Sequence, residues 1–162
     1  MLALISPAKK LNYDFDPVIN THTQPDFLVE AEKLAVTARR LSRTKLARTM
    51  NLSDTLADLN WHRFQAFHTP FNLENARQAA LVFNGDTYLG LDAHSLDEQD
   101  LDYAQSRLRI LSGLYGLLRP LDLVQPYRLE MGARFKPARR NDLYDFWGTQ
   151  LSEAINHVIA DH

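Results

Sequence analysis

The pattern of apolar and polar positions predicts a strand at the start of the chain, followed by a loop and a long helix. The apolar residues 2–5 end at Ser6 and Pro7, which is typical of a buried strand entering a loop, because proline has no amide proton for a sheet ladder. After Pro25, apolar side chains recur at helical spacing over residues 27–41. Proline suits a first helical turn, where its missing N–H is not needed.

The middle of the chain combines capping residues with one turn signal. Residues 44–50 are predicted to form a short helix, and Ser53 is a candidate N-cap for the next one. Asn72 is a candidate cap for a further helix. Residues 80–89 carry β-forming side chains on both sides of an Asn-Gly pair, which favours tight turns, so we expect a hairpin or strand–turn pair there.

The second half begins with a capping box, in which a serine hydroxyl and a glutamate carboxylate satisfy each other's free N–H groups. Residues 95–98 match this pattern, and the apolar stripe that follows extends the predicted helix to Leu111. Residues 127–132 alternate like a half-buried strand with Arg128 and Glu130 on one face. Asn141 is expected to cap a closing helix that reaches Ile159.

These elements predict an α+β fold class, a helix-rich mixed domain with a small sheet, formed by residues 1–162 as one unit. The composition, with 45% hydrophobic and 23% charged residues, fits such a domain. The chain contains no cysteine, which excludes disulfides, thiolate metal sites and thiol nucleophiles. The six histidines lack metal-ligand spacing, so we predict neither a metal nor a cofactor.

Neither a secretory leader nor a membrane-spanning segment is apparent. Apolar runs are far shorter than the roughly 20 residues that a bilayer requires. We therefore expect a cytoplasmic protein without a membrane partner.

The net charge of −2 conceals separate blocks of charge. Residues 39–48 contain five basic side chains and no acid, whereas residues 86–102 contain six acids and no lysine or arginine. Residues 107–140 contain eight basic side chains and two acids. Arginine predominates there and matches phosphate with its planar fork, which favours a phosphate-bearing partner. The alternative is an ordinary solvated face and helix ends that complement their dipoles.

Gly113 and Gly116 lie between the helix predicted to end at Leu111 and the Arg119-Pro120 pair. A helix, a glycine turn and a second helix can present backbone amides to a nucleic-acid phosphate, as a helix-hairpin-helix element does. The alternative is a C-cap glycine followed by a packed turn. The glycines are three apart, whereas the common helix-hairpin-helix form has them two apart.

Five segments carry a more specific pattern: SPAKKL at 6–11, FNGDTYLGL at 83–91, ILSGLYGLLRPLD at 110–122, QPYRLEMG at 125–132 and LYDFWG at 143–148. In this order they resemble the YaaA peroxide-stress-resistance family, apart from Lys10, where family members often have threonine. The resemblance implies a cytoplasmic bacterial protein that limits peroxide damage and free intracellular iron. It also implies a DNA-binding basic cleft with a helix-hairpin-helix element.

Family members continue beyond the closing helix, so the chain resembles an N-terminal portion of a longer fold. An exposed strand edge or apolar patch is the expected consequence.

The leading functional hypothesis is a non-enzymatic protein that binds double-stranded DNA non-specifically through its phosphates. The residues predicted to contact DNA are Lys9, Lys10, Arg107, Arg109, Ser112, Gly113, Tyr115, Gly116, Arg119 and Arg128. An alternative is an enzyme that acts on a phosphorylated or nucleotide-like substrate, with Lys9, Arg128 and Glu130 converging in the same cleft. A weaker alternative is direct sequestration of iron.

Overall fold

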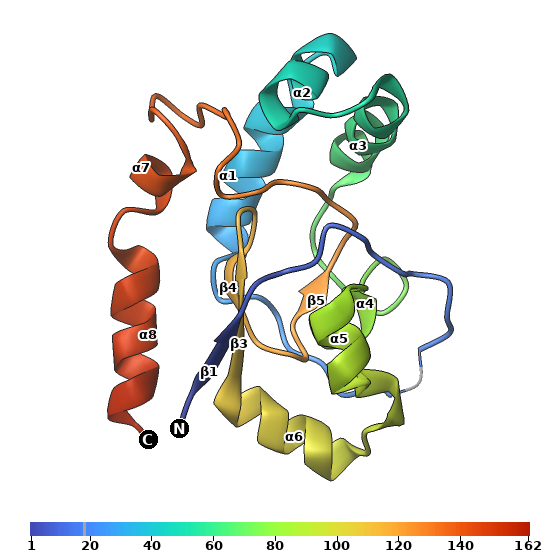
Figure 1. Ribbon diagram of the computed structural model, residues 1–162, viewed down its shortest axis with the longest axis vertical. Helices are drawn as coiled ribbons and strands as arrows, with labels where there is room; N and C mark the ends of the chain where they lie inside the picture. The colour runs from blue at the N-terminus through green and yellow to red at the C-terminus, as the bar shows by residue number, and fades with distance from the viewer. Residues whose placement is uncertain (18) are drawn as a thin grey trace.

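A three-stranded sheet lies at the centre of the molecule (Figure 1). Its strand order is β1-β3-β4, in which β1 (Ala3–Ile5) runs parallel to β3 (Leu108–Ser112), and β3 runs antiparallel to β4 (Gly116–Leu118). A second sheet pairs β2 (Arg77–Gln78) antiparallel with β5 (Leu123–Val124). The computed structural model describes residues 1–17 and 19–162, and within them the helix-rich mixed fold is confirmed.

Helices surround the sheets, with α2 and α3 at one end of the molecule and α6 at the other (Figure 1). The helices of the described residues are α1 (Leu28–Arg39), α2 (Arg43–Met50), α3 (Asp54–Ala66), α4 (Ala79–Val82), α5 (Asp86–Leu91), α6 (Glu98–Arg107), α7 (Leu143–Trp147) and α8 (Gln150–Ala160), with a short 3-10 turn at Ala93–Ser95. The first three helices confirm the prediction from apolar spacing. Ser53 caps α3 as expected, because its hydroxyl accepts a hydrogen bond from the Leu56 N–H at 3.3 Å.

The hairpin predicted over residues 80–89 is wrong, since α4 and α5 occupy this segment. Gly85 has an extended φ of −160° and precedes α5, so the Asn-Gly pair does not adopt the positive φ of a hairpin turn. The side chains of α4 are all buried. A short segment that is buried on every side shows neither helical nor strand periodicity, so its sequence could not distinguish a helix from a strand. Asn72 likewise caps a turn, with its Oδ1 accepting from the Glu74 and Asn75 N–H groups.

The boundaries of α6 also differ from the prediction. Asp97 caps it by accepting from the Asp100 N–H at 2.8 Å, whereas the Ser95 hydroxyl donates to the Asp92 carbonyl. The helix ends at Arg107, and Leu108–Ser112 forms the central strand β3. The predicted helix failed here because the segment gains a strand neighbour on each side, from β1 and β4, which local spacing does not reveal.

The predicted helix-hairpin-helix element is wrong for the same reason. Residues 113–115 join β3 to β4 in a β-hairpin, with Ser112 opposite Gly116 in the ladder. Gly116 has a φ of +73°, a conformation that favours glycine. The turn at Ser112–Gly116 therefore belongs to the sheet.

The first strand and the closing helix need two further corrections. β1 is an edge strand in which Leu4 is 44% exposed, so it is not the buried strand that was predicted. The expected exposed strand edge is confirmed. The closing helix is divided by Gly148 at a φ of +52°, and Asp142 rather than Asn141 caps its first part. No side chain of α8 is fully buried.

Candidate anion-binding site

The segment at residues 127–132 passes over the β3–β4 turn. Its backbone packs against Gly113 so closely that a Cβ atom there would lie 2.2 Å from the Leu129 carbonyl oxygen. Tyr127 and Leu129 are buried, while Arg128 and Glu130 are more exposed. The predicted alternation is confirmed, but the predicted strand is wrong because the segment joins no sheet. Contact with the turn thus directs Arg128 and Glu130 outward.

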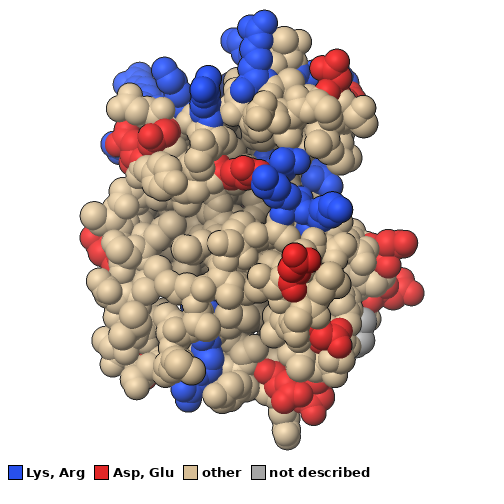
Figure 2. Space-filling view, in the orientation of Figure 1, with Lys and Arg blue, Asp and Glu red and all other residues tan. Residues whose placement is uncertain are grey.

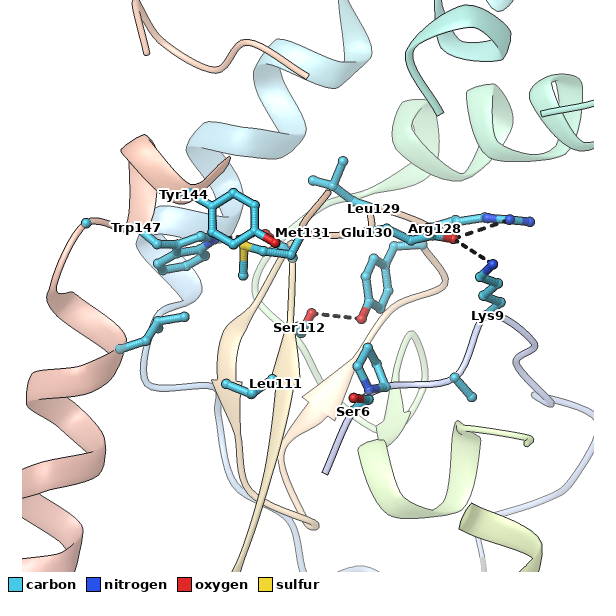
Figure 3. Close-up of a pocket in the computed structure, with 16 residues that line it drawn as sticks. Ser6, Lys9, Leu111, Ser112, Arg128, Leu129, Glu130, Met131, Tyr144 and Trp147 are labelled. Carbon is cyan, nitrogen blue, oxygen red and sulfur yellow. Dashed lines mark hydrogen bonds and ion pairs between the residues drawn. The ribbon is translucent and has the colours of Figure 1, made fainter. Parts of the chain in front are cut away.

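Lys9, Arg128 and Glu130 form a charged trio at the surface (Figure 3). Glu130 Oε1 lies 3.5 Å from Lys9 Nζ and 3.4 Å from Arg128 Nη2. The Lys9 and Glu130 side chains are largely exposed, so their ion pair is weak and easily rearranged. Arg128 Nε is buried and has no hydrogen-bond partner among residues 1–17 and 19–162. The predicted convergence of these three residues is confirmed.

An apolar cavity of about 580 Å³ opens beside the charged trio. Figure 3 shows Tyr144, Met131 and Trp147 on one side of it and the charged trio on the other. Its floor includes Ser112, whose hydroxyl is 2.7 Å from the Tyr127 hydroxyl. Its apolar lining includes Leu111, Leu129, Met131, Trp147 and Leu151. This volume lies within the range of small-molecule sites, which are mostly apolar with a few polar groups.

A second, polar hollow of about 410 Å³ is also lined by Arg128. Arg48 at the end of α2 and Arg134 in the loop after residue 132 line it together with Arg128 and Glu130. The Arg134 N–H donates to the Thr49 carbonyl at 3.1 Å and so holds this loop against the end of α2. The apolar cavity and the polar hollow share Arg128 and Glu130.

The polar hollow has an excess of positive charge. Arg48 and Arg134 are exposed, and in the part of the chain that the structure describes neither makes an ion pair. Figure 2 shows one face of the molecule, on which most lysine and arginine side chains lie over the upper half and the acids lie mainly below them. Three arginines beside one glutamate favour an anionic ligand.

Tyr127 contributes a neutral hydroxyl to the apolar cavity. Burial raises the pKa of Tyr127 above its ordinary value, although its hydrogen bond to Ser112 acts in the opposite direction. Burial therefore favours the protonated, neutral hydroxyl.

The glycine turn predicted to contact DNA is buried in the fold, and only Ser112 and Gly113 of it line the apolar cavity. Ser112, Gly113, Tyr115 and Gly116 are all buried. The Ser112 hydroxyl oxygen accepts from the Tyr115 N–H at 3.0 Å, so this amide is already satisfied. The burial of the turn and its satisfied Tyr115 amide argue against direct contact between this backbone and a nucleic acid.

Two of the predicted arginines have structural partners instead. Arg109 is only 9% exposed and donates to the carbonyls of Gln105 and Leu108, and burial lowers its pKa. Arg119 pairs with Asp122 at 3.0 Å and with Asp26 at 3.2 Å. Arg109 Nη1 and Arg119 Nε and Nη2 are thus engaged within the fold.

Of the other predicted cations, Lys9 and Arg128 lie at the cavity, whereas Lys10 and Arg107 are exposed but do not line it. Arg107 lies over the Tyr103 ring, 5.3 Å from its centroid. The prediction missed Arg48 and Arg134. Both belong to the basic blocks of the sequence, but nothing local distinguishes them from their neighbours.

Among residues 1–17 and 19–162, no three His, Asp or Glu side chains are grouped so that they could hold a metal ion. Within the same residues, no helix is both long enough and apolar enough to cross a bilayer.

The fold and the site define a mixed α/β protein in which a cationic hollow adjoins an apolar cavity. The chain belongs to the family described as peroxide stress protein YaaA, whose model matches residues 1–161, so it is placed among peroxide-stress proteins. The resemblance drawn from the five sequence segments is thereby confirmed.

Two curated relatives illustrate the match. A UPF0246 protein of Aromatoleum aromaticum is 54% identical over 160 residues, which cover 99% of this chain and 61% of the relative. A UPF0246 protein of Burkholderia mallei is 54% identical over 156 residues, which cover 96% of this chain and 60% of the relative. The chain thus spans about three fifths of the length of these relatives.

Proposed function

We propose that this chain serves in peroxide stress by binding double-stranded DNA through its phosphates at the polar hollow. The observation that carries the proposal is the convergence of Arg48, Arg128 and Arg134 beside a single glutamate. The exposed Lys9 and Lys10 add positive charge nearby. This surface replaces the buried glycine turn as the expected contact.

The expected binding is electrostatic and weakly selective for sequence. Each arginine that neutralises a phosphate releases condensed counterions, so affinity falls steeply as salt increases. Phosphate contacts position a protein on the duplex but do not read its bases. Arginine suits this role because its fork binds phosphate oxygens in pairs and remains charged.

Fluorescence anisotropy with a short labelled duplex tests this proposal. The double variant Arg48→Ala, Arg134→Ala is expected to bind at least tenfold more weakly, and its salt slope should fall by about two. Arg107→Ala is the matched control, because Arg107 is exposed but lies outside the polar hollow. The proposal fails if the duplex does not bind, or if the double variant and the control behave alike.

DNA binding would also bear on damage caused by free iron. Phosphates attract cations, so a protein that covers them competes with iron for the same positions. We expect the protein to reduce cleavage of a duplex by ferrous iron and hydrogen peroxide, and the double variant to protect less. Equal protection by both proteins would contradict this mechanism.

A second candidate function is binding or turnover of a small phosphorylated molecule. The apolar cavity next to the charged trio favours it, because a duplex phosphate would leave this cavity unused. In an enzyme, Glu130 is the candidate general acid or base, since its carboxylate is exposed at the cavity edge between two cations.

A further inference from the structure

The apolar cavity and the polar hollow are chemically different halves that share two side chains. Arg128 and Glu130 line both, while Met131 and Trp147 line only the first and Arg134 only the second. A ligand that fills both must carry an apolar or aromatic part and an anionic part. The link between these parts must be short, because the two hollows adjoin at Arg128.

The apolar half suits a flat ring. Tyr144 is 65% exposed, and Figure 3 shows its ring beside Met131 and Trp147. An exposed aromatic ring next to a cavity offers a face on which a nucleobase can stack, and such stacking tolerates any base. Sugar phosphates and inorganic phosphate would gain little from this lining.

The polar half has unused donors for a phosphate. Arg128, which lines both halves, and Lys9, which lines only the apolar cavity, approach the same oxygen, Oε1 of Glu130. A lysine carries three donors and an arginine five, so each keeps donors for another acceptor. The buried Nε of Arg128 is already without a partner among the described residues, and the exposed Arg134 lines the same hollow.

We infer that the two hollows form one site for a free nucleoside monophosphate, with its base beside Tyr144 and its phosphate between Arg128 and Arg134. The inference rests on the phosphate binding proposed above for the polar hollow and adds a base subsite to it. Paired bases inside a duplex could not enter the apolar cavity, so its occupant is a free or unstacked nucleotide.

Isothermal titration calorimetry of the full chain with three probes tests the inference: adenosine 5′-monophosphate, ribose 5-phosphate and adenosine. We expect the nucleotide to bind at least tenfold more tightly than either fragment. Tyr144→Ala should weaken nucleotide binding at least fivefold and leave ribose 5-phosphate unchanged. Arg134→Ala should weaken both phosphorylated probes and leave adenosine unchanged.

Tyr103→Ala is the matched control, because Tyr103 is 66% exposed on α6 and does not line the cavity. If ribose 5-phosphate binds as tightly as the nucleotide, or if Tyr144→Ala and Tyr103→Ala behave alike, the base subsite is overturned while phosphate binding stands. If the nucleotide binds as expected but a duplex does not, the DNA proposal fails and the nucleotide site stands. Absence of binding by all probes would overturn the inference.

Discussion

Gly113→Ala is expected to lower the free energy of unfolding by about 2–3 kcal/mol. The new Cβ would lie 2.2 Å from the Leu129 carbonyl oxygen and 3.2 Å from the Glu130 carbonyl carbon. Both are backbone atoms, so no side chain can rotate away to relieve the overlap. The segment at residues 127–132 would have to move off the β3–β4 turn. Denaturant unfolding followed by circular dichroism measures the loss.

Gly90→Ala is the matched control for this substitution. Gly90 lies in α5 with no atom within 4 Å of its added Cβ, so alanine should be neutral or stabilise the protein by up to about 1 kcal/mol. Equal effects of the two substitutions would show that the close approach at Gly113 does not constrain the fold. Because the displaced segment carries Arg128 and Glu130, Gly113→Ala should also weaken ligand binding in any protein that still folds.

Asp122→Ala is expected to lower the free energy of unfolding by about 3 kcal/mol. The Asp122 side chain is fully buried and accepts hydrogen bonds from the Thr23 hydroxyl at 2.6 Å and from the Arg119 backbone N–H at 2.7 Å. It also pairs with the Arg119 guanidinium. Removal of the carboxylate leaves both partners inside the fold without their acceptor, which costs more than loss of an exposed ion pair.

The same denaturation measurement with Asp102→Ala provides the control. Asp102 is exposed on α6, so its substitution should change stability by less than about 0.5 kcal/mol. If Asp122→Ala were as mild as the control, the buried network around Arg119 would not hold the loops together as we infer.

Local sequence patterns predicted helices correctly where a helix exposes one face and buries the other. In α1, residues Ala31, Leu34, Ala35 and Ala38 are buried at the spacing that predicted the helix. The cap at Ser53 depends only on an N–H group three residues away, so it was equally predictable. The helix predicted over residues 108–112 was wrong because a strand forms only when distant segments pair with it. Its partner β1 lies about a hundred residues earlier in the chain.

For the candidate site too, some features follow from the sequence alone and others depend on contacts between distant segments. The sequence by itself determined the family, the absence of thiol chemistry and the presence of two arginine-containing basic blocks. It also brought forward Lys9, Arg128 and Glu130 as a possible cluster, which the structure confirmed.

Only the tertiary structure decided which arginines are available to a ligand. Arg119 looks like a free cation in the sequence, yet its guanidinium donates to the carbonyl of Gln24, 95 positions away, and pairs with Asp122. Arg48 and Arg134 resemble their neighbours in the sequence, yet the fold brings them to one hollow with Arg128. The physical reason is that a guanidinium binds a ligand only with donors that the fold has not used, and those donors are settled by contacts between distant segments.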